Sequence, residues 1–180
     1  MPEITLDQVA AAVAELRAAN ENAARSLSLP DPEDASRPYS VAPPAGPADP
    51  ARIAEVETAL GRKLPPSFRH FLSLHDGWKE ADMGSDLLGT QALIEFNTLY
   101  AERALRPILD EIERDTPDDL VVFGKFPSDN SMFIFDASEP DDDGEWTVIE
   151  YDAKEGMLDE YDNFLEFLKD TADTVRMMGG

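Results

Sequence analysis

The stretch from Asp49 to Trp78 constrains the fold most, because it predicts two short helices joined by a tight turn. Asp49 can cap the first helix, Pro50 suits its first position, and Gly61 can adopt the left-handed conformation that ends it. The segment Leu64-Pro65-Pro66 stops this helix and begins a second one, which Gly77 ends. Each helix has one apolar face, formed by Ile53, Val56 and Leu60 in the first and by Phe68, Phe71, Leu72 and Leu74 in the second.

The first 48 residues differ in pattern from the rest of the chain. Residues 4–27 carry apolar side chains at helical spacing and predict a long amphipathic helix. Residues 30–50 contain seven prolines and no apolar periodicity, which predicts an extended linker. We therefore divide the chain into an N-terminal extension at 1–48 and a domain at 49–180, and we expect the domain to fold without the extension. The helix either packs on the flank of the domain, or it pairs with a second copy of the chain in a homo-oligomer or with a partner protein.

The region after Trp78 predicts a mixture of strands and helices. Leu87-Leu88 predicts a short strand, and Asn97 is expected to cap a helix that Pro107 kinks. Three further strands and a last helix follow, at residues 120–123, 132–135, 146–151 and 162–175. The predicted fold class is α+β, with a small twisted, mainly antiparallel sheet covered by helices.

The order of these motifs resembles that of the SUKH superfamily, the Smi/Knr-like domains. The resemblance begins in the helix pair and continues through Leu120-Val121-Val122-Phe123-Gly124, Met132-Phe133-Ile134-Phe135-Asp136, Thr147-Val148-Ile149 and Asn163-Phe164-Leu165-Glu166-Phe167-Leu168, so it covers about residues 49 to 170. It implies the α+β fold and, for most bacterial members, an immunity protein against a polymorphic toxin. The residues of the opening motif are expected to be structural: Gly61, Leu64, Pro65, Phe71, Gly77 and Trp78.

The composition narrows the kinds of partner. The chain has 15 Lys and Arg against 38 Asp and Glu, a formal charge of -23, which argues against binding nucleic acid or an anionic membrane. It contains no cysteine, so disulfides and thiolate metal sites are excluded. The sequence shows neither a signal peptide nor a transmembrane stretch, and the predicted location is cytoplasmic.

The sequence predicts no catalytic residue, no cofactor and no metal. His70 and His75 are five residues apart on one predicted helix, so they lie on different faces. The acidic segment from Glu139 to Glu150 has the spacing of a calcium-binding EF-hand loop, but Pro140 and the strand that follows do not suit that motif. We therefore expect an acidic hairpin turn there and a protein that is not an enzyme.

The densest acidic run extends from Asp136 to Asp173, with fifteen Asp and Glu residues and two lysines. Such a run either keeps a face solvated or presents a field to a cationic partner. On the second view, the candidate partner-binding residues are Glu139, Asp141, Asp142, Asp143, Glu145, Asp152, Glu155 and Asp159. The expected partner is a cognate toxin protein, such as a basic nuclease. The alternative function is a non-catalytic scaffold or regulatory adaptor of the Smi/Knr type, in which the N-terminal extension would be the working part.

Overall fold

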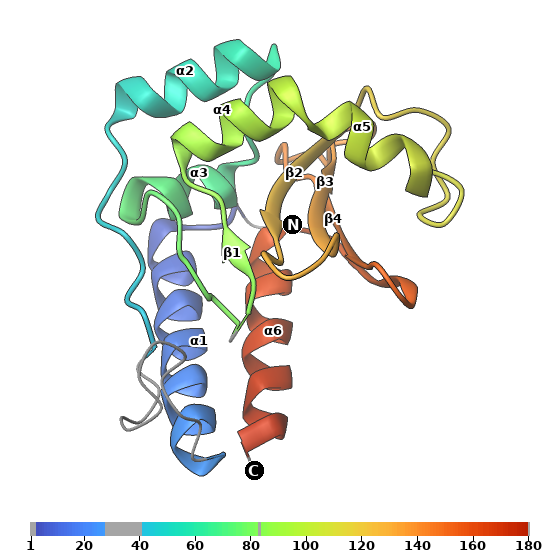
Figure 1. Ribbon diagram of the computed structural model, residues 1–180. Helices are drawn as coiled ribbons and strands as arrows, with labels where there is room; N and C mark the ends of the chain where they lie inside the picture. Colours follow the sequence, from blue (N-terminus) through green and yellow to red (C-terminus); the bar gives the residue numbers. More distant parts are fainter. Residues whose placement is uncertain (1–2, 28–40, 83, 180) are drawn as a thin grey trace.

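A computed structural model describes residues 3–27, 41–82 and 84–179 of the protein. The helices are α1 (Leu6–Ser26), α2 (Pro50–Leu60), α3 (Pro66–Leu74), α4 (Thr90–Leu99), α5 (Ala101–Leu105), the 3-10 helix η1 (Arg106–Ile108) and α6 (Phe164–Gly179). The strands are β1 (Asp86–Leu87), β2 (Leu120–Lys125), β3 (Met132–Asp136), β4 (Thr147–Asp152) and β5 (Gly156–Tyr161). The elements form an α+β fold, which confirms the predicted class (Figure 1).

The strands form one antiparallel sheet in the order β1-β2-β3-β4-β5. Each strand pairs with its neighbour in the sequence: β2 to β5 form consecutive hairpins, whereas α4, α5 and η1 connect β1 to β2. The sequence pattern predicted β1 to β4 but missed β5, whose residues Leu158, Asp159 and Glu160 are exposed. Because β5 is an edge strand with little buried surface, it lacks the alternating apolar signal of the central strands.

Side chains alternate along the strands and supply two separate cores, one on each face of the sheet. On one face, Val121, Phe123, Phe133 and Phe135 pack with α3 and α6. On the other, Val122, Ile134, Ile149 and Tyr151 pack with α5 and η1. The larger core contains Phe68, Phe71, Trp78, Phe164 and Leu168 together, which confirms the predicted contact between the helix pair and the last helix.

The helix pair forms as the local sequence predicts. Asp49 accepts a hydrogen bond from the Ala51 amide at 2.8 Å, and Gly61 ends α2 at φ 68°. Gly77 has φ 91°, and a Cβ atom there would lie 2.6 Å from the Gly89 nitrogen, so any side chain would clash. Of the remaining predicted structural residues, Leu64, Pro65, Phe71 and Trp78 are all buried.

Helix α1 lies beside α6, and the two form a long pair below the sheet in Figure 1. Thr5 and Gln8 form a capping box at its start, and the apolar stripe of α1 belongs to the larger core. At one crossing the helices are so close that a Cβ on Gly179 would lie 2.7 Å from the Ala23 Cα. The stripe therefore packs on its own chain, while the domain boundary after residue 48 and the homo-oligomer stay predictions. Residues 41–49 of the expected linker contain no helix or strand, and its residues 30–40 lie outside the described part of the chain.

The helix expected to begin at Asn97 is organised differently. Asn97 does not cap a helix but lies inside α4, where its side chain donates to the Leu93 and Val122 carbonyls and accepts from the Val122 amide. This side chain joins α4 to β2, because it supplies both a donor and an acceptor to one strand residue. The helical segment is also broken at Tyr100, and Pro107 lies in η1 rather than in a kinked α-helix.

Candidate binding site

The predicted partner-binding carboxylates do not form one patch. They occupy the loop between β3 and β4, the turn after β4, and strand β5. The loop and the turn flank opposite ends of β4, a strand of six residues, so they lie about 20 Å apart. The loop holds Glu139, Asp141, Asp142, Asp143 and Glu145; the end of β4 and its turn hold Asp152 and Glu155; β5 holds Asp159.

Glu145 is not a surface residue, so its assignment to the partner-binding surface was wrong. Only 3% of it is exposed, and its carboxylate accepts hydrogen bonds from the Ser67 amide at 2.8 Å and the Ser67 hydroxyl at 2.5 Å. Burial raises the pKa of Glu145, the charges of Asp141 and Asp143 add to this, and the bonds from Ser67 oppose it. Because α3 has no side-chain cap of its own, Glu145 caps that helix from a distant loop.

Two other predicted residues stabilise turns. Asp141 accepts hydrogen bonds from the Asp143 and Glu145 amides, both at 2.9 Å. Asp152 accepts from the Lys154 amide at 2.8 Å and the Glu155 amide at 3.0 Å, and these backbone bonds lower its pKa. Such local bonds are typical of aspartate in turns, so these two carboxylates have a structural role besides their charge.

The structure brings together a different set of carboxylates around Glu150, whose side chain meets the hydroxyl of Tyr161. This carboxylate cluster consists of Glu150 from β4, Asp159 from β5, Asp170 from α6 and Asp82 from the loop before β1. Tyr161 Oη lies 3.0 Å from a Glu150 oxygen and 3.2 Å from an Asp170 oxygen. Asp159 lies opposite Glu150 because β4 pairs with β5. Of the four cluster members, it alone was among the predicted partner-binding residues.

The cluster carries uncompensated negative charge. Burial raises the pKa of Glu150, and repulsion from Asp82, Asp159 and Asp170 raises it further. Burial and the charge of Glu150 also raise the pKa of Tyr161, so the phenol keeps its single proton. None of the four carboxylates forms an ion pair with a base in the part of the chain that the structure describes. A cationic group from outside would relieve this repulsion.

The pKa shifts of five carboxylates predict that the protein is most stable in mildly acidic solution. Asp82, Glu145 and Glu150 have raised pKa values, so their stabilisation is complete below their unfolded values, about 4 to 4.5, and is lost as the pH rises through the folded values. Asp136 and Asp152 have lowered pKa values, so their stabilisation is lost as the pH falls below about 4. The melting temperature should therefore peak at about pH 4 to 4.5 and fall toward neutral pH.

Thermal unfolding followed by circular dichroism tests this pH dependence. Glu150→Gln should make the fall between mildly acidic and neutral pH shallower, because it removes one carboxylate with a raised pKa. Glu139→Gln is the matched control, since it removes one charge from an exposed loop residue, and it should leave the slope close to that of the unchanged protein. A melting temperature that rises steadily to neutral pH would contradict the prediction.

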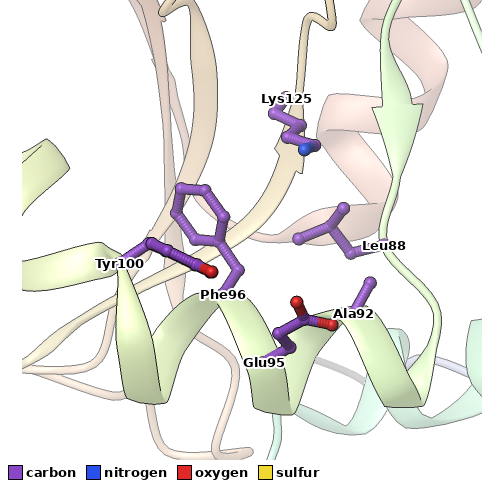
Figure 2. Close-up of a pocket in the computed structure, with 6 residues that line it drawn as sticks. All are labelled: Leu88, Ala92, Glu95, Phe96, Tyr100 and Lys125. Atoms are coloured by element: carbon purple, nitrogen blue, oxygen red, sulfur yellow. The ribbon is translucent and has the colours of Figure 1, made fainter.

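A second feature is a hollow of about 360 Å³ between α4 and the end of β2. Figure 2 shows its lining: Ala92, Glu95 and Phe96 from α4, Tyr100 from the turn after α4, Lys125 from β2, and Leu88 from the segment after β1. The Lys125 ammonium lies 5.8 Å from the centre of the Phe96 ring, which is a cation–π contact. Sequence reasoning missed this hollow, since nothing in the local pattern places Lys125 beside Phe96.

Metal ligands do not gather in the part of the chain that the structure describes. Within residues 3–27, 41–82 and 84–179, no three His, Asp or Glu side chains are grouped so that they could hold a metal ion. His75 contacts the Ala45 carbonyl at 2.9 Å through Nδ1, and the segment from Glu139 to Glu150 runs through a turn into β4. No helix among the described residues is long and apolar enough to cross a bilayer.

The antiparallel sheet, the capped helix pair and the aromatic core define an α+β domain of the type expected from the order of the sequence motifs. The chain belongs to the SMI1/KNR4 family (SUKH-1), whose model matches residues 47–170. The match begins two residues before Asp49 and ends within α6, so it confirms the extent of the resemblance. Among curated proteins, no significant sequence match was found.

Proposed function

We propose that this protein is an immunity protein that binds and neutralises a cognate bacterial toxin and catalyses no reaction. Membership of the SMI1/KNR4 family supports this role, since most bacterial proteins of the SUKH superfamily that the sequence resembles are immunity proteins. The net charge of -23 favours a basic partner, such as a nuclease whose own surface attracts phosphate. Such a protein would act in the cytoplasm of the cell that produces the toxin.

The carboxylate cluster is the observation that carries the proposal. Its members come from three different secondary-structure elements and a loop, so the charges are held in place by the fold rather than by one flexible segment. Asp159 and Asp170 are exposed, whereas Glu150 is partly buried between them and the core. A lysine or arginine of a partner would meet two accessible carboxylates in front of a third that already has a raised pKa. Charges arranged in this way steer the approach of a basic protein.

Association kinetics with the product of the neighbouring toxin gene test the proposal. Asp159→Asn and Asp170→Asn together keep the shape of the cluster and remove two charges, so they should slow association about tenfold or more at low salt. Raising the ionic strength should slow association of the unchanged protein, because the attraction between exposed charges is largely screened beyond about 10 Å at 0.1 M salt.

The control removes the same number of charges from the loop between β3 and β4, which the sequence analysis had suggested as part of the binding surface. Glu139→Gln with Asp142→Asn changes two exposed loop carboxylates and should leave the association rate close to that of the unchanged protein. If the loop variant slows association and the cluster variant does not, the toxin binds at the loop between β3 and β4. If the toxin does not bind at all, the immunity role is wrong and the scaffold or adaptor alternative takes its place.

A further inference from the structure

The hollow in Figure 2 belongs to a longer depression, which we call the α4 groove. A second hollow of about 590 Å³ shares Phe96, Tyr100 and Lys125 with it and extends toward Tyr151. A third, of about 380 Å³, shares Leu88 and Ala92 with it and extends toward Trp78. The three hollows therefore form a continuous groove along one side of α4.

The groove has apolar side chains that remain open to solvent. Tyr100 is 51% exposed, and it lines the first two hollows. Phe96 lies between the first two hollows and contacts the Tyr100 ring at a centroid distance of 6.1 Å. Exposed apolar groups that are gathered around a hollow are typical of a surface that binds another molecule.

The cations in the groove have no carboxylate partner. In residues 3–27, 41–82 and 84–179, the side chains of Lys79, Arg103 and Lys125 form no ion pair or hydrogen bond, and the Lys125 ammonium lies over the Phe96 ring. A shortage of acids does not explain this, since Asp and Glu outnumber Lys and Arg by 38 to 15. Three unpaired cations along one groove are therefore an exception to the charge pattern of the chain.

The acids that line the groove are mostly engaged with the backbone. Asp76 accepts from the Thr90 amide at 2.6 Å, Asp86 from the Glu80 amide at 3.0 Å, and Asp129 from the Ser131 amide at 2.8 Å. These hydrogen bonds partly satisfy the carboxylates, which makes them weaker partners for a ligand. The exposed Glu95 lies across the first hollow from Lys125 and is the exception (Figure 2).

We propose that the α4 groove binds an extended acidic segment of a partner protein, in which aromatic or aliphatic side chains alternate with carboxylates. The apolar side chains would contact Phe96 and Tyr100, and the carboxylates would pair with Arg103, Lys125 and Lys79. This site is separate from the carboxylate cluster and prefers the opposite charge. The proposal therefore does not depend on the immunity function, and each can fail without the other.

A fluorescein-labelled peptide that alternates Asp and Phe is a suitable probe, with its binding followed by fluorescence anisotropy. We expect saturable binding, together with changes in the amide NMR shifts of α4 and of β2. Arg103→Glu with Lys125→Glu should weaken binding about tenfold or more, because two attractions become repulsions. Lys169→Glu is the matched control, since it reverses one charge on α6, and it should leave the affinity unchanged.

A peptide that alternates Lys and Phe provides the opposite charge with the same aromatic content. The proposal is overturned if this basic peptide binds as tightly as the acidic one, if the double variant binds the acidic peptide normally, or if the unchanged protein shows no saturable binding. Circular dichroism establishes that the variants are folded. Should the double variant not fold, Arg103→Glu alone changes one exposed side chain and should weaken binding about threefold.

Discussion

Replacing Phe68 with alanine should lower the free energy of unfolding by about 3 to 5 kcal/mol. Phe68 is completely buried, and its ring lies 5.0 Å from the ring of Phe164 and 5.1 Å from that of Phe135, measured between centroids. It also contacts Phe71 and Phe123, so one side chain connects α3, the sheet and α6. Its loss would leave a cavity that these rigid elements cannot fill.

Chemical denaturation measures this loss, and Leu99→Ala provides the control. Leu99 is 66% exposed at the end of α4, so its truncation should change the free energy of unfolding by less than about 0.5 kcal/mol. The same experiment on Phe71→Ala should resemble Phe68→Ala, because Phe71 is equally buried and its ring centre lies 5.4 Å from that of Phe164. If Phe68→Ala had the same denaturation midpoint as the unchanged protein, the placement of Phe68 in the aromatic core would be wrong.

Deleting residues 1–48 should destabilise the remaining chain by about 5 kcal/mol or more. Val9, Val13 and Leu16 are nearly completely buried, and burying each such side chain contributes about 1.5–3 kcal/mol. Two polar contacts are lost as well: Asn20 donates to the Ala81 carbonyl at 2.6 Å, and Glu15 pairs with Arg176 at 3.2 Å. Since small domains have a total stability of about 5–15 kcal/mol, the shortened chain should be marginally stable.

Near-ultraviolet circular dichroism and sedimentation of the chain from residue 49 to 180 test this expectation. Adding a separate peptide of residues 1–27 should restore the melting temperature, because the peptide can cover the exposed face of α6. A matched peptide with Leu16→Asp should not restore it. A shortened chain that melts like the full protein would instead support the independent domain predicted from the proline-rich linker.

The candidate site could be predicted only in part, and the reason is clear from individual residues. The acidic run from Asp136 to Asp173 was visible as composition, and Asp159 was correctly placed on the exposed surface. Asp82 was not considered, because it lies outside that run and joins the carboxylate cluster only through the fold. Glu145 was assigned to the surface although it is buried, since its partner Ser67 is 78 residues away in the sequence.

The sequence by itself determined the elements that depend on near neighbours. Gly61 and Pro66 set the end of α2 and the start of α3, and the alternating apolar residues of β2 to β4 set which side chains face each core, because these effects act over a few residues. Only the tertiary structure decided which charges meet. The pairing of β4 with β5 and the packing of α6 place Glu150, Asp159 and Asp170 around Tyr161, and the packing of α4 beside β2 places Lys125 over Phe96. The strength of an electrostatic interaction depends on distance and burial in space, and neither can be read from spacing along the chain.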